Sequence, residues 1–249
     1  MSLTNTAQTA IVVGASRGLG RGIATALADA GTPVAAVARD REALTELAAT
    51  AANVRPEVAD ATDPAVAGTL LDRYDPHALV LVAGASPLMR PLQHQTWETF
   101  SVNWQTDVRM TFHWVREALL RPMTPGGRII VMSSGAALQG SPLSGGYAGA
   151  KQTQRFITAY AQEEANRGGH ELTFAAILPR ITPQTELGRP AVQAYATRAG
   201  QTEEEYMAPM GPPVTPEAAG AGVLEILGAE PGAVAPAYLL TGEGVKPLP

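Results

Sequence analysis

The stretch that decides the fold reads Ala10-Ile11-Val12-Val13-Gly14-Ala15-Ser16-Arg17-Gly18-Leu19-Gly20. Its first four residues are apolar and predict a short buried strand, and the amphipathic stretch Leu19–Ala30 predicts a helix that stops at Gly31. Glycine accepts positive φ and carries no Cβ, so a phosphate can approach the turn closely. Because the following helix points free N–H groups at such an anion, the turn predicts a dinucleotide-binding site.

Short apolar runs alternate with amphipathic stretches along the rest of the chain. The strand-like runs are Ala10–Val13, Pro33–Ala38, Val54–Val58, Ala78–Ala83, Arg128–Met132, Thr173–Leu178 and Ala237–Thr241. The helix-like stretches are Leu19–Ala30, Arg41–Ala52, Pro64–Tyr74, Thr96–Leu120, Ser144–Arg167 and Pro216–Leu227. Apolar runs without alternation are typical of strands buried on both faces of a parallel sheet. The sequence therefore predicts one α/β domain over residues 1–249, with a doubly wound (Rossmann) parallel sheet of seven strands and helices on both faces.

The segment from Pro179 to Pro216 departs from this alternation of strand-like and helix-like stretches. It contains seven of the 20 prolines, together with Met207 and Met210. It follows the end of a predicted strand, which is where ligands bind in open α/β sheets. We interpret residues 179–216 as a substrate lid without regular structure. The alternative interpretation is a surface insertion that packs against nothing.

Composition excludes several classes of protein. The chain has no cysteine, which excludes disulfides and thiolate chemistry, and its net charge of −5 leaves no broad basic surface for nucleic acid or an anionic membrane. No apolar run approaches the roughly 20 residues of a membrane span, and residues 1–10 show no secretory signal. The histidines at positions 77, 94, 113 and 170 have no metal-ligand spacing. We expect a cytoplasmic protein without a metal site.

The end of the second predicted strand, Val37-Ala38-Arg39-Asp40, bears on the choice of cofactor. An acidic side chain at this point binds the ribose 2′-hydroxyl of a dinucleotide, whereas an arginine accommodates a 2′-phosphate. Arg39 and Arg17 supply two cations here, so the sequence favours NADP(H) over NAD(H). In the alternative interpretation Arg39 begins a solvated helix and Asp40 binds the ribose.

Tyr147 and Lys151 lie four residues apart at the start of a predicted helix, on one face. An ammonium beside a phenol favours the phenolate, so such a tyrosine can exchange a proton with a carbonyl or alcohol oxygen. Of the 18 Lys and Arg residues, Lys151 and Lys246 are lysines and the others are arginines. An amine at position 151 is therefore unusual for this chain. An ordinary helix face that carries both residues is the alternative.

Ser134 follows the predicted strand Arg128–Met132 and precedes Tyr147 by thirteen residues. Because strand carboxyl ends carry the sites of such folds, its hydroxyl can hydrogen-bond the reacting oxygen. Taken alone, a serine at this point is equally explained as a helix cap or turn residue.

From Thr9 to Gly244 the chain resembles the short-chain dehydrogenases/reductases in their single-domain form. Gly14, Gly18 and Gly20 match the cofactor turn of that family, and Ser134, Tyr147 and Lys151 match its catalytic residues in order and spacing. Asn103 matches its catalytic asparagine, which holds a water that links the lysine to solvent, and Asp60 matches the residue that meets the adenine. The implied cofactor site comprises Gly14, Ser16, Arg17, Gly18, Leu19, Gly20, Arg39, Asp60, Ala61, Ala83, Gly84, Tyr147, Lys151, Pro179, Ile181 and Thr182.

Several positions depart from the family pattern. Val13 replaces a threonine, Leu81-Val82 replaces two asparagines before Ala83-Gly84, and Arg180 replaces a glycine. The first two changes remove polar links within the sheet, so we expect them to affect stability or cofactor fit. Arg180 either contacts an anionic group of a ligand or points outward. The threonine that meets the nicotinamide amide has two candidates, Thr182 and Thr185.

The resemblance implies an NADP(H)-dependent oxidoreductase that transfers hydride between the nicotinamide and a carbonyl or secondary alcohol, with Tyr147 as proton donor or acceptor. A mostly apolar substrate pocket is expected from Ser86, Leu88, Gln139, Ser141, Tyr206 and Met210. The alternative is a catalytically silent NADP(H)-binding sensor or scaffold.

An apolar stripe on the long predicted helix suggests subunit contacts. Its members are Trp97, Phe100, Trp104, Val108, Thr111 and Val115. This stripe and the helix that carries Tyr147 suit pairing between subunits, and the resemblance implies a homo-oligomer, a dimer or tetramer. Core packing explains the stripe equally well.

Overall fold

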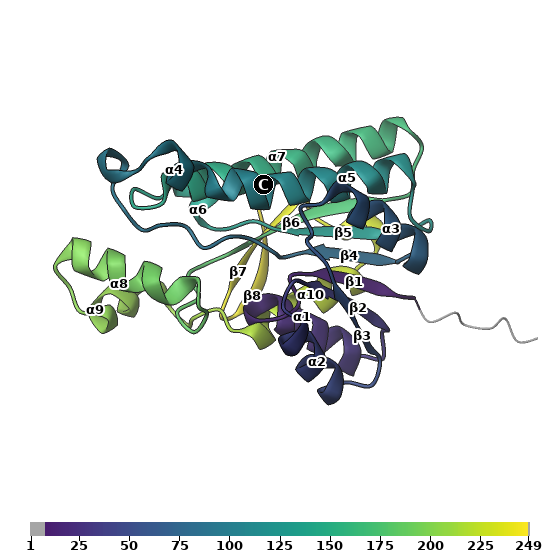
Figure 1. Ribbon diagram of the computed structural model, residues 1–249, viewed down its shortest axis with the longest axis horizontal. Helices are drawn as coiled ribbons and strands as arrows, with labels where there is room; N and C mark the ends of the chain where they lie inside the picture. The colour runs from purple at the N-terminus through teal and green to yellow at the C-terminus, as the bar shows by residue number, and fades with distance from the viewer. Residues whose placement is uncertain (1–7, 249) are drawn as a thin grey trace, which may run out of the picture.

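The structure, a computed structural model, describes residues 8–248 and contains one sheet with helices on both faces (Figure 1). In the order β3-β2-β1-β4-β5-β6-β7-β8, its strands are β1 (Ala10–Val13), β2 (Val34–Ala38), β3 (Val54–Val58), β4 (Ala78–Leu81), β5 (Arg128–Met132), β6 (Thr173–Pro179), β7 (Ala237–Thr241) and β8 (Gly244–Leu248). The strands β1 to β7 are parallel, so the predicted doubly wound α/β fold is confirmed. The segment in which no secretory signal is predicted lies mostly outside the described residues.

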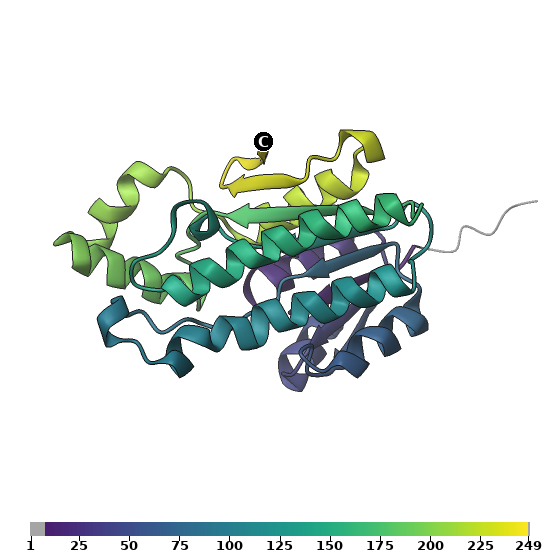
Figure 2. The same cartoon turned by 90° about the horizontal axis from the view of Figure 1, so that it is seen from above.

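The two faces of the sheet carry separate layers of helices. The helices are α1 (Gly18–Asp29), α2 (Arg41–Thr50), α3 (Pro64–Tyr74), α4 (Trp97–Asn103), α5 (Arg109–Leu120), α6 (Ala136–Gln139), α7 (Gly145–Arg167), α8 (Gly188–Ala199), α9 (Glu203–Met207) and α10 (Pro216–Gly228). Figure 2 shows α5 and α7 side by side over one face, while α1 packs against α10 on the other. Along β1, Ile11 and Val13 pack under the first layer and Val12 under the second, which explains why the central strands are apolar throughout.

Within residues 8–248 the sheet has eight strands, so the prediction of seven was one short. β8 is antiparallel to β7 and lies at the edge of the sheet. Its sequence, Gly-Val-Lys-Pro-Leu, shows neither an apolar run nor clean alternation, and an edge position tolerates its proline because one side of the strand makes no ladder bonds. The other edge strand, β3, exposes Arg55 and Pro56. The expectation that all strands are buried on both faces was therefore wrong for β3.

The predicted helix Thr96–Leu120 is divided by a π-helical turn, η2 (Trp104–Val108), between α4 and α5. A π-turn holds an extra residue, so side chains after it are rotated relative to those before it. As a result Thr111 and Val115 are buried in the core, whereas Trp97 is 71% exposed and Trp104 is 40% exposed. The single apolar face predicted from the spacing does not exist, because the π-turn divides it into a core part and a surface part.

The segment Pro179–Pro216 contains helices, contrary to the expectation of no regular structure. α8 and α9 are followed by the short 3₁₀ helix η3 (Ala208–Met210), and Figure 1 shows them projecting beyond one end of the sheet. The prolines do not prevent these helices because Pro190 and Pro209 fall in first turns, where a missing N–H does not remove a helical bond. Thr202 and Glu205 form a capping box at the start of α9, a signal that was present in the sequence.

Candidate active site

The turn between β1 and α1 is closed tightly around its glycines. Gly14 and Gly18 have φ values of +94° and +53°. A Cβ on Gly14 would lie 2.5 Å from the Ala83 nitrogen, and one on Gly20 would lie 2.0 Å from the Gly14 oxygen. The first turn of α1 has no acidic side chain, and its N-cap residue Arg17 makes no side-chain cap. The start of α1 therefore keeps the open N–H groups that a pyrophosphate requires.

A cavity of about 1120 Å³ opens above this turn, at the carboxyl ends of the parallel strands. Its lining includes every residue of the implied cofactor site: Gly14, Ser16, Arg17, Gly18, Leu19, Gly20, Arg39, Asp60, Ala61, Ala83, Gly84, Tyr147, Lys151, Pro179, Ile181 and Thr182. Ser134, Ser86, Gln139, Ser141, Tyr206 and Met210 also line it. Leu88 is not part of the lining, which has Pro87 and Met89 in this loop instead.

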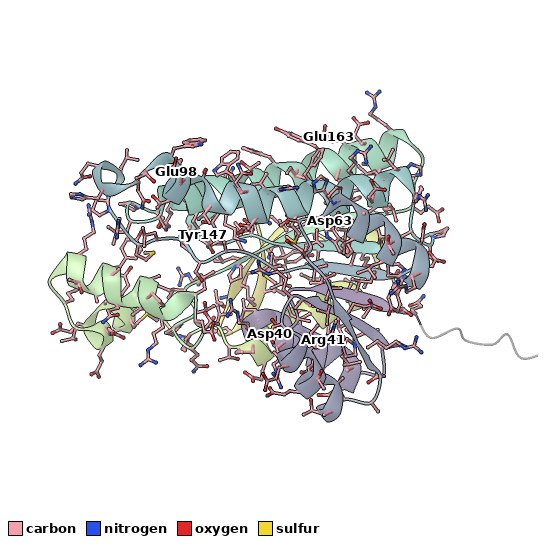
Figure 3. The ribbon with its side chains drawn as sticks, in the orientation of Figure 1. Asp40, Arg41, Asp63, Glu98, Tyr147 and Glu163 are labelled. Atoms are coloured by element: carbon pink, nitrogen blue, oxygen red, sulfur yellow. The ribbon has the colours of Figure 1, made fainter. Side chains whose placement is uncertain are left out.

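Tyr147 and Lys151 lie together at the centre of the cavity wall. Lys151 Nζ is 5.6 Å from the centroid of the Tyr147 ring, and Tyr147 lies below α7 in the view of Figure 3. Lys151 is 4% exposed and donates to the Met132 carbonyl over 3.1 Å. Ser133 Oγ donates to the Lys151 carbonyl over 2.7 Å, so α7 is held against the end of β5. The adjacent Ser134 lines the cavity, and its Oγ accepts from Ala136 N over 3.2 Å.

Asn103 lies behind this wall, buried at the end of α4 and outside the cavity lining. Its Nδ2 donates to the Ala85 carbonyl over 2.6 Å and lies 3.3 Å from Asp107 Oδ1, while its Oδ1 has no partner. Asp107 is also fully buried, and its Oδ2 lies 3.2 Å from Lys151 Nζ. Sequence reasoning missed Asp107. The available signal was an acidic residue four positions after Asn103 on a helix that faces the sheet.

The residues considered for cofactor selection have distinct environments. Arg39 is exposed at the end of β2 and lines the cavity. Asp40 Oδ1 accepts from Ala43 N over 3.1 Å and caps α2, at whose start Figure 3 labels Asp40 and Arg41. Asp60 accepts from the Thr62 amide and hydroxyl, and these bonds hold the pKa of its carboxyl below the ordinary value. The Asp40 carboxylate is thus engaged in capping α2, whereas the Arg39 side chain has no role in the cap and lines the cavity.

The segment 179–216 contributes to the cavity lining and contacts the glycine turn. Arg17 Nη1 lies 2.5 Å from Glu186 Oε2, so a carboxylate of this segment meets the glycine turn. Arg180 Nη1 donates to the Met210 carbonyl over 3.2 Å, so this side chain is directed to the backbone of the same segment. Thr182 and Thr185 have their hydroxyl oxygens 2.9 Å apart, and both line the cavity.

The outer end of the cavity contains an unpredicted tyrosine. Tyr195, on α8, hydrogen-bonds Ser141 through its hydroxyl and accepts from Leu143 N over 3.2 Å. Its ring stacks on Tyr206 with centroids 6.2 Å apart, and burial raises the pKa of Tyr206. Sequence reasoning missed Tyr195 because its partners lie more than 50 residues earlier in the chain.

Residues 8–248 contain neither a metal-binding cluster nor a membrane-spanning helix. No group of three or more His, Asp or Glu side chains is placed to hold a metal ion within this range. Nor is any helix in the same range both long and apolar enough to cross a bilayer.

The chain is similar in sequence to known proteins. Residues 8–196 match the short chain dehydrogenase family. L-xylulose reductase of Cavia porcellus is 28% identical over 193 residues, covering 76% of this chain and 77% of that protein. The hydroxynaphthalene reductase-like protein Arp2 of Metarhizium robertsii is 30% identical over 185 residues, covering 70% and 68%.

Two solved structures share the fold. One is a short chain dehydrogenase from Burkholderia cenocepacia J2315 in complex with NADP, with a TM-score of 0.80 and 22% identity over 95% of this chain and 97% of that one. The other is ElxO with NADP bound, with a TM-score of 0.78 and 20% identity over 94% and 96%. With a family match that covers most of its length, this chain belongs to the short-chain dehydrogenase/reductase family.

Proposed function

We propose that this protein is an NADP(H)-dependent oxidoreductase that interconverts a carbonyl compound and an alcohol. The observation that carries the proposal is the juxtaposition of Tyr147 and buried Lys151, in the same cavity as the glycine turn. The cradle fits a dinucleotide because Gly14 and Gly20 leave no room for side chains and the first turn of α1 is uncapped. When bound, the nicotinamide supplies or accepts the hydride.

In this mechanism the side chains of the protein transfer the proton. Tyr147 gives its hydroxyl proton to the carbonyl oxygen as the new C–H bond forms at carbon, and the product is an alcohol. The remaining phenolate is stabilised by the Lys151 ammonium, and Ser134 donates a hydrogen bond that orients the reacting oxygen. Asn103 supports the return of a proton from solvent by way of Lys151. Alcohol oxidation follows the same steps in reverse.

NADP(H) is the proposed cofactor because of the charges around the ribose end of the cavity. Arg39 is exposed there with no acidic side chain in the equivalent role, since Asp40 caps α2. The solved structures with the same fold carry NADP, which supports this choice. Carbonyl substrates are supported by the reductase names of the relatives, and they bind between Ser134 and the Tyr195–Tyr206 stack.

A silent NADP(H)-binding protein is the second candidate function. It is favoured by Leu81-Val82 in place of two asparagines and by Arg180, which is directed to the lid backbone. A panel of ketones, aldehydes and acyl thioesters, assayed by NADPH absorbance, distinguishes the two: turnover of any substrate excludes the silent protein.

Tyr147→Phe tests the reductase directly. The substitution removes the proton donor and leaves the ring, so kcat should fall at least 100-fold while the NADPH Kd stays within twofold. Tyr74→Phe is the matched control because Tyr74 lies at the end of α3, outside the cavity lining. More than a few per cent residual activity in Tyr147→Phe contradicts the proposed role.

We also propose a homo-oligomer that forms through the outer side of α4, α5 and α7. Trp97, Phe112, Phe156 and Tyr160 are 71%, 51%, 48% and 59% exposed, and Phe156 stacks on Tyr160. Such aromatic surface is typical of subunit interfaces. Phe156→Glu should reduce the mass measured by light scattering to that of a monomer, whereas Arg167→Glu, at the end of α7, should not. A native protein of 25.9 kDa mass in solution contradicts this proposal.

A further inference from the structure

A buried carboxylate lies directly behind the catalytic lysine. The Asp107 side chain is 0% exposed, the Lys151 side chain is 5% exposed, and the two charged groups are 3.2 Å apart. The ion pairs Arg121–Asp72 and Arg73–Glu57, by contrast, lie at the surface. Removing one partner of a buried pair leaves a charge without solvent or counter-ion. The charge of Asp107 is therefore compensated by that of Lys151, and the reverse.

The site is shaped to hold this carboxylate. Asp107 Oδ1 accepts from Ala85 N over 2.8 Å and from Thr106 Oγ1 over 3.0 Å, while Oδ2 is directed at Lys151 and also accepts from Asn103 Nδ2 over 3.4 Å. Gly84 makes room for it, since a Cβ there would lie 2.7 Å from Oδ2. Asp107 belongs to the π-helical turn, and such turns often occur at functional sites.

The charged groups around Asp107 come mainly from α7. Lys151 faces the carboxylate directly, and Tyr147 lies beyond Lys151. The loop after β4 contributes Gly84 and a backbone amide at this point, with no titratable side chain. Arg109, two positions along the helix, is exposed and acts on Asp60 and His113 instead. The Tyr147–Lys151 pair is therefore the group on which Asp107 acts.

We propose that Asp107 is a positioning residue, whose carboxylate holds the Lys151 ammonium beside Tyr147, the arrangement from which Tyr147 can give a proton to a carbonyl oxygen. This inference rests on the proposed function. A nearby negative charge favours the charged form of an ammonium, and a buried ammonium depends on such a partner more than an exposed one does.

The pH dependence of carbonyl reduction tests this inference. Asp107→Asn keeps the shape of the side chain and removes its charge, so the alkaline decline of kcat/KM should move to lower pH by about one unit. Asp107→Glu restores a carboxylate and should return the decline toward its original position. Thr111→Val is the matched control because Thr111 is buried one turn further along and bonds Gln154. A uniform loss of kcat with an unmoved decline overturns the proposal.

A stability measurement covers the case in which Asp107→Asn unfolds, and it needs no substrate. Asp107→Asn should lower the urea midpoint, and adding Lys151→Met should recover most of the loss, because the second change removes the uncompensated charge. A double variant no more stable than Asp107→Asn overturns the proposal. If no carbonyl compound oxidises NADPH, the proposed function fails, but the urea midpoints of the single and double variants still measure the coupling between Asp107 and Lys151. If reduction occurs and the alkaline decline does not move, the function stands and the inference fails.

Discussion

Arg17 in the glycine turn and Glu186 in the lid form an ion pair 2.5 Å long across the mouth of the cavity. The two side chains are 66% and 71% exposed. They come from segments 169 residues apart, and both side chains line the cavity. With a cofactor phosphate at the glycine turn, as proposed, we expect that phosphate and Glu186 to compete for the same guanidinium.

Glu186→Gln should strengthen NADPH binding. The change frees Arg17 for the cofactor, and because an exposed ion pair contributes only about 0.2–1 kcal/mol, the expected decrease in Kd is about 1.4- to fivefold. Fluorescence titration at low and high salt measures it, and the difference should shrink in high salt. Asp72→Asn, which opens the exposed pair with Arg121, is the control and should leave the Kd unchanged. Weaker NADPH binding by Glu186→Gln would contradict this competition.

Arg39→Asp should reverse the cofactor preference. It places an acid where a 2′-phosphate would bind, so kcat/KM for NADPH should fall at least tenfold while that for NADH rises. Asp40→Ala is the informative control: it should lower the free energy of unfolding by about 1 kcal/mol through loss of the α2 cap and leave the NADPH preference intact. If Asp40→Ala changes the preference instead, Asp40 rather than Arg39 selects the cofactor.

Features encoded in neighbouring residues could be predicted from the sequence. The helix Pro64–Tyr74 matches α3 at both ends because Asp63 caps it and Pro64 occupies its first turn. The strand-to-helix turn at Gly14 could likewise be predicted, because its glycines are close together in the sequence. The π-turn at Trp104–Val108 could not be predicted, because Asp107 is held there by groups brought in by β4 and α7. Likewise, no local pattern indicates that Glu186 reaches Arg17.

Tyr195→Phe should loosen the lid at the outer end of the cavity. Its hydroxyl joins α8 to Ser141 and Leu143, whereas the ring alone makes the stack with Tyr206. Loss of the hydroxyl should raise the KM of the carbonyl substrate several-fold, leave kcat within about twofold, and cost about 1 kcal/mol of stability. Steady-state kinetics at saturating NADPH measures this. Tyr74→Phe controls for the loss of a hydrogen-bonded phenol elsewhere, because Tyr74 donates to Glu57 from the end of α3. A fall in kcat with unchanged KM would contradict a positioning role for the lid.

Two partly buried histidines, His77 and His113, make the stability of the protein depend on pH. Burial and the nearby Arg128 lower the pKa of His77, and burial, Arg109 and Arg116 lower that of His113. The folded protein therefore favours both imidazoles neutral, and below the ordinary pKa of 6.5 the unfolded chain binds more protons than the folded one. The free energy of unfolding should thus decrease as the pH falls from about 7.5 to 5.5.

Urea unfolding of His77→Gln and of the double variant His77→Gln/His113→Gln at the two pH values checks this sign. The pH dependence should weaken in the single variant and weaken further in the double variant, because each glutamine removes a group that must otherwise protonate on unfolding. His94→Gln is the control, since His94 is exposed in the short 3₁₀ helix Leu92–His94. A slope as steep in the double variant as in the native protein would assign the acid sensitivity to groups other than these two histidines.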